Sequence, residues 1–541
     1  MIARKSLLIL SSTFILQIIN AVQFIILIKF WGDFAPTAIG SIGLAMSFIA
    51  LFNIVSDLGF NQAHIKRISE GKDLGTCIGT FATIKIILTI IMVLITIISF
   101  FIIKNILGLE IYDPNTESII FIFLIVNVFA NLSSIPFVTF TGKKEMVKRE
   151  FPYIFGVGIG FPFTILVITA GVSAAKISPA FIWPGFLRPI QQFISENALK
   201  SLALTYVVVW LIILFSYYWF FRRYPIKKPN RFYFKSYLTF ALPMMFLPII
   251  TIIIKNADRL IIGYYWSTIE VGYYFSMTAL ISVILVFSNS INAVLFPSIS
   301  EFCSNEMFIR VKGLINLAER YISMVSIFLI VIVVLLAKPI ILIIMSDVFL
   351  GAAPILTILA IYAFFYSINT PYNCLLIGMD KPVILTKITI VTCIITIILS
   401  LLFVPKNGLL SIFDINGASG AAMAITISAI VAFFALRFVT KKLTDIKLWQ
   451  NYTFRHVFAG LIVGIILYYL SLYNLFLPFI HLYQIIIFIL IGLAIYVGVL
   501  VLLKEFDKDD LHFFLDCLNP KKMLKYISSE LKDETNEFNK K

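Results

Sequence analysis

The chain is poor in charged residues, in histidine and in cysteine. Asp, Glu, Lys and Arg make up 13% of its 541 residues, and it has four histidines and five cysteines. Hydrophobic residues reach 60% and the mean hydropathy is +1.00, which excludes a soluble multidomain protein. The histidines lie far apart, and the sequence has neither a GxxxxGK[ST] phosphate loop nor a GxSxG motif. We therefore expect no cofactor and no ATP hydrolysis.

The cysteines show neither the paired spacing of a zinc site nor that of a disulfide framework. They lie in or beside apolar runs, or in segments that we place in the cytoplasm. We expect all five to be reduced thiols: Cys77, Cys303, Cys374, Cys393 and Cys517.

The sequence contains many long apolar runs. Each is about 20 residues long, the length that crosses a bilayer as an α-helix. Runs such as 86–103 lack the alternation of barrel strands, so we predict an all-α integral membrane protein with about fourteen transmembrane helices. The runs are 7–28, 36–56, 78–103, 118–140, 152–172, 202–221, 237–256, 271–295, 321–345, 353–377, 384–404, 418–438, 457–475 and 483–503.

Basic residues collect in alternate loops, which by the positive-inside rule places both termini in the cytoplasm of a multi-pass plasma-membrane protein. Lys85 and Arg437 lie within spans, near their inner ends. Topology and contact with anionic lipid account for the net charge of +15, so we expect membrane lipids as partners and no nucleic acid. The polar stretch from Lys504 is expected to be a short amphipathic helix followed by a solvated tail.

The sequence contains a weak internal repeat. The shift that aligns the fourth span with the tenth puts Asn127 on Tyr362, Asn131 on Tyr366, Ser134 on Asn369 and Pro136 on Pro371. Because the paired spans are an even number apart, both copies cross in the same direction, and we predict a parallel repeat of two six-helix lobes. The expected parts are 1–225 for the N-terminal lobe, 226–440 for the C-terminal lobe, 441–504 for two extra helices and 505–541 for a cytoplasmic tail.

The aligned positions form one polar face in each lobe. Asn127, Asn131 and Ser134 recur at helical spacing, and so do Tyr362, Tyr366, Asn369 and Asn373. Such faces form hydrogen bonds between membrane helices or line a hydrated cavity, and we favour the cavity because the faces recur in both lobes.

A charged cluster, Lys255, Asn256, Asp258 and Arg259, stands at the expected outer end of the seventh span. Two cations around one anion leave a positive charge for a phosphate or carboxylate. The alternative is an interfacial anchor in which Lys255 reaches the headgroups and Asp258 pairs with Arg259. The semi-apolar outer segment 174–200, with Pro179, Trp183 and Arg188, is interpreted as an interfacial helix or, alternatively, as a lid.

Two segments carry a family resemblance. Ser56-Asp57-Leu58-Gly59-Phe60 with Lys66-Arg67-Ile68-Ser69, and Asn256-Ala257-Asp258-Arg259 continuing to Gly263, resemble the Wzx-like polysaccharide-biosynthesis flippases of the multidrug, oligosaccharidyl-lipid and polysaccharide exporter superfamily. The order of features, the repeat and the extra pair of spans agree with this resemblance. The long segment 174–200 departs from the compact family pattern.

The resemblance implies a flippase, not an enzyme, that moves a polyprenyl-(pyro)phosphate-linked oligosaccharide to the outer leaflet by alternating access. Lys255 and Arg259 would contact phosphate, Asp258 would orient them, and Asn127, Asn131, Tyr366, Asn369 and Asn373 would contact sugar hydroxyls. Other polysaccharide-assembly proteins are candidate partners. The rival hypotheses are a cation-coupled multidrug antiporter of the same superfamily, which should bury an unpaired acid, and a membrane glycosyltransferase, which should carry an acidic catalytic motif in a large outer domain.

Overall fold

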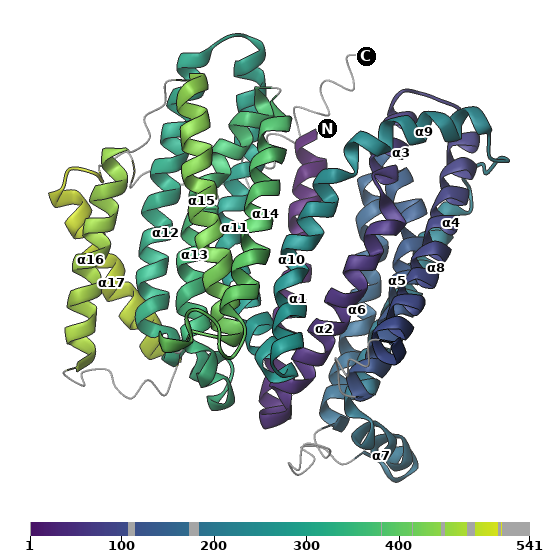
Figure 1. The fold of residues 1–541 in the computed structure, drawn as a ribbon, viewed down its shortest axis with the longest axis horizontal. Helices are drawn as coiled ribbons and strands as arrows, with labels where there is room; N and C mark the ends of the chain where they lie inside the picture. The colour runs from purple at the N-terminus through teal and green to yellow at the C-terminus, as the bar shows by residue number, and fades with distance from the viewer. Residues whose placement is uncertain are drawn as a thin grey trace. The chain divides into compact units, whose positions relative to one another are not determined.

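The computed structural model describes residues 2–106, 114–171, 183–379, 381–413, 415–444, 450–472, 482–506 and 510. These residues form helices joined by short turns, and no strand occurs among them (Figure 1). The predicted all-α class is confirmed. The chain divides into two compact units, the first ending at Tyr264 and the second running from Tyr265 to Asn519.

The first unit holds ten helices in its described part. They are α1 Ile2–Trp31, α2 Ala35–Asp57, α3 Phe60–Ser69, α4 Leu74–Phe101, α5 Pro114–Gly142, α6 Met146–Gly171, α7 Arg188–Glu196, α8 Ala198–Phe221, α9 Arg231–Met244 and α10 Phe246–Tyr265. Figure 1 shows the long helices running alongside one another, with α9 at one end of the unit and α7 beyond the other.

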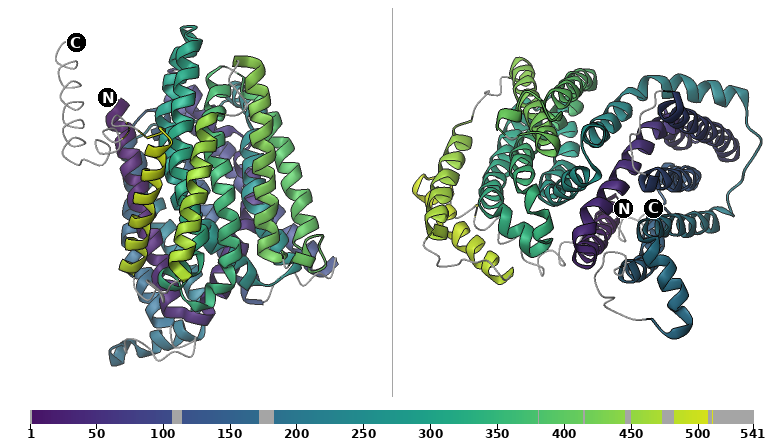
Figure 2. Two further views of the ribbon diagram at one scale, coloured as in Figure 1. Left: turned by 90° about the vertical axis from the view of Figure 1, so that its left-hand side faces the viewer. Right: turned by 60° about the horizontal axis from the view of Figure 1, so that its bottom comes forward.

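The second unit holds seven helices in its described part. They are α11 Thr268–Ser304, α12 Phe308–Ile344, α13 Ala353–Gly378, α14 Pro382–Phe403, α15 Gly417–Thr444, α16 Asn451–Leu472 and α17 Leu482–Leu502. α16 and α17 pack on α12, beside the remaining helices of the unit (Figures 1 and 2).

The two units use similar helix pairings. In the first unit α5 packs against α2, α4, α6 and α8, and in the second α13 packs against α11, α12, α14 and α15. The central helix in each unit is the one that carries the predicted polar face. These pairings are what a duplicated lobe would show, while the parallel relation and the lobe boundary at 225 stay predictions.

Twelve segments are long and apolar enough to cross a membrane among the residues searched. The first, Ile15–Asp57, includes the later part of α1 and all of α2, and α10 is not among the twelve. α10 carries Lys255, Asp258 and Arg259 within its 20 residues, which dilutes its apolar content. The chain is therefore a multi-pass membrane protein, and the count of fourteen stays a prediction.

The helices turn large apolar side chains outward, as a lipid environment allows. α4 is the clearest case, because Ile90, Leu94 and Ile98 are more than half exposed. Aromatic and aliphatic side chains fill the cores within each unit, for example Phe81, Phe140 and Tyr217 in the first. No disulfide joins the four cysteines in the described part of the chain, and Cys517 lies outside it.

A left-handed turn links α2 to α3. Leu58 has φ 42° and Gly59 has φ 82°, a conformation that favours glycine. A Cβ on Gly59 would lie 2.6 Å from the carbonyl oxygen of Ala241 in α9. Only glycine fits there, since backbone geometry and the close approach of α9 act together.

His64 of α3 forms hydrogen bonds with α5 and α9 at this end of the first unit. Its Nδ1 lies 2.7 Å from the Tyr237 hydroxyl in α9, and its Nε2 lies 2.9 Å from the Thr139 hydroxyl in α5. Because the Thr139 hydroxyl also donates to the Ile135 carbonyl, the tautomer that fits these contacts has Nε2–H donating to Thr139 and Nδ1 accepting from Tyr237. Burial lowers the pKa of His64 from its ordinary 6.5 to about 3, so the ring is neutral.

Candidate functional site

A polar network joins α2 and α5 in the first unit. The Asn131 side-chain nitrogen donates to Asn53 Oδ1 at 2.7 Å, and the Ser56 hydroxyl lies 2.8 Å from Asn131 Oδ1. Asn131 is 5% exposed. These bonds are the kind that holds membrane helices together, so Asn131 is engaged between helices in this structure.

Lys85 of α4 completes this network. Its ammonium donates to the Ser56 carbonyl at 2.9 Å, and its side chain is 2% exposed. Ser56 lies in the last turn of α2, where the backbone carbonyls carry partial negative charge and attract a cation. Sequence analysis placed Lys85 near the inner end of a span but not among the candidate site residues. A lysine inside the apolar run of α4 was the signal that could have identified it.

The polar face of α5 therefore divides into two parts. Asn127, one turn before Asn131, donates to the Phe123 carbonyl of its own helix at 3.0 Å and is partly exposed. Its side-chain oxygen is an acceptor and can receive a hydrogen bond from a solute. Asn127 fits the cavity interpretation better than Asn131 does.

The charged cluster lies in the middle of α10 and not at the outer end of a span. The sequence placed it at a span end because apolar content falls at Asn256, yet the helix continues to Tyr265. The predicted seventh span, 237–256, is also divided, since α9 ends at Met244 and α10 begins at Phe246.

The side chains of the cluster differ in exposure. Lys255 is exposed, Arg259 is partly buried and Asp258 is 2% exposed. Asp258 and Arg259 both have interaction partners. A Cβ on Gly263, one turn after Arg259, would lie 2.4 Å from Leu44 Cδ2, so α10 approaches α2 closely here. The exposed member, Lys255, is the cation that a solute can reach directly.

The polar face of α13 in the second unit is divided in the same way. Asn369 is 6% exposed and donates to the Ala429 carbonyl in α15 at 3.2 Å. Tyr366 is 39% exposed and Asn373 is partly exposed. The Tyr362 and Tyr366 ring centroids lie 5.8 Å apart. Tyr366 and Asn373 are therefore the accessible ones among the three residues of this face that were predicted to contact sugar.

A buried ionic group lies elsewhere in the second unit. Arg437 of α15 pairs with the Glu319 carboxylate of α12, and the Tyr372 hydroxyl donates to Glu319 Oε2 at 2.5 Å. The Arg437 guanidinium also lies 4.3 Å from the centroid of the Tyr372 ring. Glu319 is fully buried and Arg437 is 3% exposed. Sequence analysis noticed Arg437 only as a basic residue within a span and did not foresee its partners.

A second ionic group binds the segment that follows α17. Arg320 Nε donates to Glu505 at 3.0 Å, and its Nη2 donates to Asp510 at 2.6 Å. Arg455 of α16 donates to Glu505 at 2.7 Å. Glu505 and Asp510 are 7% and 2% exposed, so the start of the predicted solvated tail is held against α12 and α16. Residues 511–541 lie outside the described part.

The outer segment is described only from residue 183. The Gln191 side-chain oxygen accepts from the Trp183 backbone nitrogen at 3.1 Å, and α7 begins at Arg188. Phe186, Ile190 and Phe193 are exposed on α7 or just before it. This agrees with an interfacial helix, while Pro179 lies outside the described residues.

Comparisons with known proteins extend this picture. A family model described as polysaccharide biosynthesis protein matches residues 193–354, a stretch that includes α10. A comparison with curated protein sequences found no match.

Among solved structures, the lipid II flippase MurJ in an inward closed conformation is similar over 94% of this chain and 99% of its own, with a TM-score of 0.66 and 16% identity. An inward-facing multidrug resistance MATE family transporter of the MOP superfamily covers 79% of this chain and 95% of its own, with a TM-score of 0.54 and 14% identity. An outward-facing MATE family transporter is similar over 82% of this chain and 96% of its own, with a TM-score of 0.51 and 14% identity. The chain has the fold that these transporters share.

Proposed function

We propose that this chain is a flippase that carries a polyprenyl-(pyro)phosphate-linked oligosaccharide from the cytoplasmic to the outer leaflet by alternating access. The observation that carries the proposal is the likeness to a lipid II flippase over nearly the whole of both chains. The match of residues 193–354 to a polysaccharide-biosynthesis family supports the same substrate class. A function in surface polysaccharide or glycan assembly follows.

Lys255 and Arg259 bind the phosphate in this proposal, and Asp258 orients Arg259. Charged residues at membrane depth cost about 2.5–3.5 kcal/mol each, so a helix keeps three of them only where partners or water receive them. The exposure of Lys255 supports its contact with a solute. Its position in the middle of α10, and not at a helix end, favours this contact over an anchoring function.

Asn127, Tyr366 and Asn373 contact sugar hydroxyls, because they are the accessible ones among the five residues predicted to do so. Asn131 and Asn369 share those faces but already bond to neighbouring helices. They reach the sugar only if the helices separate during transport.

The protein acts without covalent chemistry in this proposal, and its partners are the glycolipid, membrane lipids and other polysaccharide-assembly proteins. It resides in the plasma membrane with both termini in the cytoplasm. The end of the first unit that carries α3 and α9 then faces the cytoplasm.

The likeness to MATE transporters favours a cation-coupled antiporter as the second candidate. Such a protein needs a buried carboxylate that can exchange a proton or sodium ion. The fully buried acid of the second unit, Glu319, is instead held by Arg437 and Tyr372. An acid neutralised by a permanent cation is a poor coupling group, which supports the flippase.

The test is leaflet exchange of a polyprenyl-phosphate oligosaccharide in liposomes that contain the wild-type chain, Arg259→Gln, Lys255→Gln or no protein. Arg188→Gln is the matched control, since it removes an exposed cation from α7. We expect exchange by the wild type and by the control, and a loss of about tenfold or more in the two α10 variants, because each loses a charge-assisted contact.

Equal exchange in all variants would remove α10 from the substrate path. Absence of exchange by the wild type, together with proton- or sodium-dependent efflux of small organic cations, would establish the antiporter.

A further inference from the structure

A cavity of about 610 Å³ opens beside the bend of α12 in the second unit. Leu336 leaves the helical conformation, with φ −103° and ψ 17°, and Pro339 follows three residues later. Proline cannot donate to the carbonyl four residues earlier, so the helix bends there. The volume lies within the roughly 300–1,000 Å³ of small-molecule pockets.

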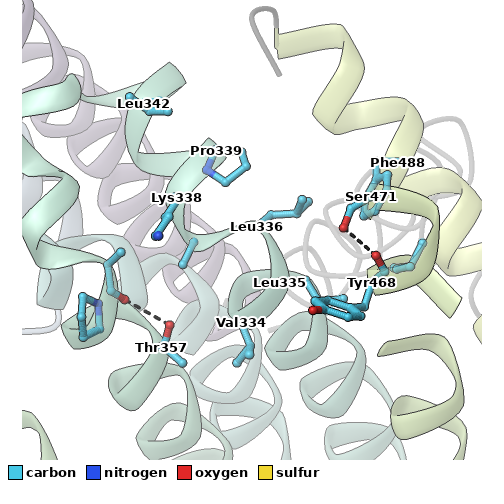
Figure 3. A pocket seen from close by; sticks show the side chains of 14 residues that line it. Val334, Leu335, Leu336, Lys338, Pro339, Leu342, Thr357, Tyr468, Ser471 and Phe488 are labelled. Carbon is cyan, nitrogen blue, oxygen red and sulfur yellow. Dashed lines mark hydrogen bonds between the residues drawn. The ribbon is translucent and has the colours of Figure 1, made fainter. Parts of the chain in front are cut away.

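The walls of this cavity come from four helices. Leu335, Leu342, Leu467 and Phe488 give it apolar sides from α12, α16 and α17, and the first turn of α13 closes it (Figure 3). A groove of this composition, in a protein whose solvent is lipid, suits a hydrocarbon chain.

Lys338 is the charged residue among the fourteen that line the cavity. Its side chain is exposed, and none of the lining residues is acidic. The ion pairs described in the second unit use Arg320, Arg437 and Arg455, and not Lys338. The cavity therefore offers a cation that an anionic ligand can neutralise.

The start of α13 adds to this positive field. Ala353 and Pro354 line the cavity, and the N-cap residue Ala352 supplies no side-chain cap. The amino end of a 26-residue helix carries a partial positive charge, so the helix and Lys338 both favour an anion. Tyr468 lines the cavity from the α16 side (Figure 3).

The place of Lys338 on α12 indicates what the anion is. Lys338 lies six residues before the end of α12 at Ile344, which is about 9 Å along the helix axis. Beside an apolar cavity near the end of a membrane-spanning helix, the available phosphates belong to membrane lipids. The cavity volume suits a single acyl chain better than a long polyprenyl chain.

We propose that this cavity binds one anionic phospholipid, with its phosphate at Lys338 and an acyl chain between α12, α16 and α17. The site is separate from the α10 cluster and does not depend on the proposed function. The bound lipid fills the space at the bend and joins α16 and α17 to the rest of the unit.

Native mass spectrometry of the full chain in detergent, titrated with phosphatidylglycerol or phosphatidylcholine, tests this site. We expect one phosphatidylglycerol to bind more tightly than phosphatidylcholine, and Lys338→Gln to weaken it by about tenfold. Lys387→Gln, which removes an exposed lysine from α14, should bind like the wild type. Ser471→Trp, which fills the cavity from α16, should lose the lipid while Lys338 stays in place.

Thermal unfolding of each variant shows that it is folded, and bound phosphatidylglycerol should raise the melting temperature of the wild type but not of Lys338→Gln. Equal affinity for the two lipids, or unchanged binding by Lys338→Gln and Ser471→Trp, would overturn the proposal. Displacement of phosphatidylglycerol by an equimolar amount of polyprenyl phosphate would also overturn it, because the site would then belong to a polyprenyl carrier.

Discussion

At the scale of single residues, the buried charges of this protein depend on one another. Glu319 and Arg437 are both buried, where an unpaired ion is costly. The Tyr372 hydroxyl donates a hydrogen bond to the Glu319 carboxylate. Removing one member should therefore harm the protein more than removing two.

We expect Arg437→Met to destabilise the protein by about 3–5 kcal/mol, because Glu319 is left charged and unpaired. The double variant Glu319→Leu with Arg437→Met should recover most of that loss. Thermal unfolding in detergent measures both. If the double variant is less stable than Arg437→Met, the pair is not the unit that this structure indicates.

His64 predicts a pH dependence of stability. Its folded pKa, about 3, lies below the ordinary 6.5, so the unfolded chain binds a proton that the folded chain does not. The contribution of the neutral His64 ring to the free energy of unfolding is fully present above pH 6.5 and decreases as the pH drops toward 3. At pH 5.5 the loss from this residue should be on the order of 1 kcal/mol.

The measurement is the melting temperature at pH 7.5 and 5.5 for the wild type and His64→Gln. The variant should be less stable at pH 7.5, and the difference between the two proteins should shrink at pH 5.5. A difference that does not change with pH would mean that His64 does not titrate on unfolding.

At the scale of elements, the segment after α17 is held by side chains of α12 and α16. Arg320 donates to both Glu505 and Asp510, and Tyr321 donates to Asp510 at 2.9 Å. The arrangement predicts that one arginine controls the attachment of this segment.

Arg320→Gln should release residues 503–506 and Asp510, because two buried carboxylates lose an arginine partner. Hydrogen exchange in that stretch should rise at least tenfold, and proteolysis just after α17 should become faster. Arg310→Gln on the same helix, which removes an arginine 6.0 Å from the Phe302 ring centroid, is the matched control. Unchanged exchange in Arg320→Gln would show that other contacts hold the segment.

Sequence reasoning worked well for elements whose signal is local. Apolar runs predicted the helices because lipid requires long uninterrupted stretches, and 353–377 agrees with α13, Ala353–Gly378, within one residue. It failed at α9 and α10, where Lys255, Asp258 and Arg259 dilute the apolar content and a short break at Met245 divides the predicted span.

The buried polar contacts could not be predicted in the same way. Lys85 meets the Ser56 carbonyl, and Arg437 meets Glu319 118 residues earlier. Such partners are determined by how the helices pack. A single sequence does not indicate which face of one helix contacts which face of another. The polar faces of α5 and α13 were predicted from periodicity, but not which members bond between helices.

At the scale of the whole molecule, the charge distribution predicts a topology that labelling can test. In cells that express single-cysteine variants, Arg188→Cys on α7 should react with an impermeant maleimide from outside, and Lys72→Cys between α3 and α4 only after the membrane is opened. Both side chains are exposed in the structure, so access to the reagent is decided by the side of the membrane. The opposite pattern would invert the topology and with it the direction of transport proposed above.

The turn between α2 and α3 bears on how proteins of this kind are recognised. Leu58 and Gly59 are left-handed, and the Ala241 carbonyl lies where a side chain on Gly59 would be. The glycine at position 59 is thus required by the chain reversal and by the close approach of α9. Matching this glycine would identify proteins that share the turn, whatever they transport. In the proposed function, cargo is contacted by α10 and by the accessible positions of α5 and α13, and none of these residues belongs to the turn.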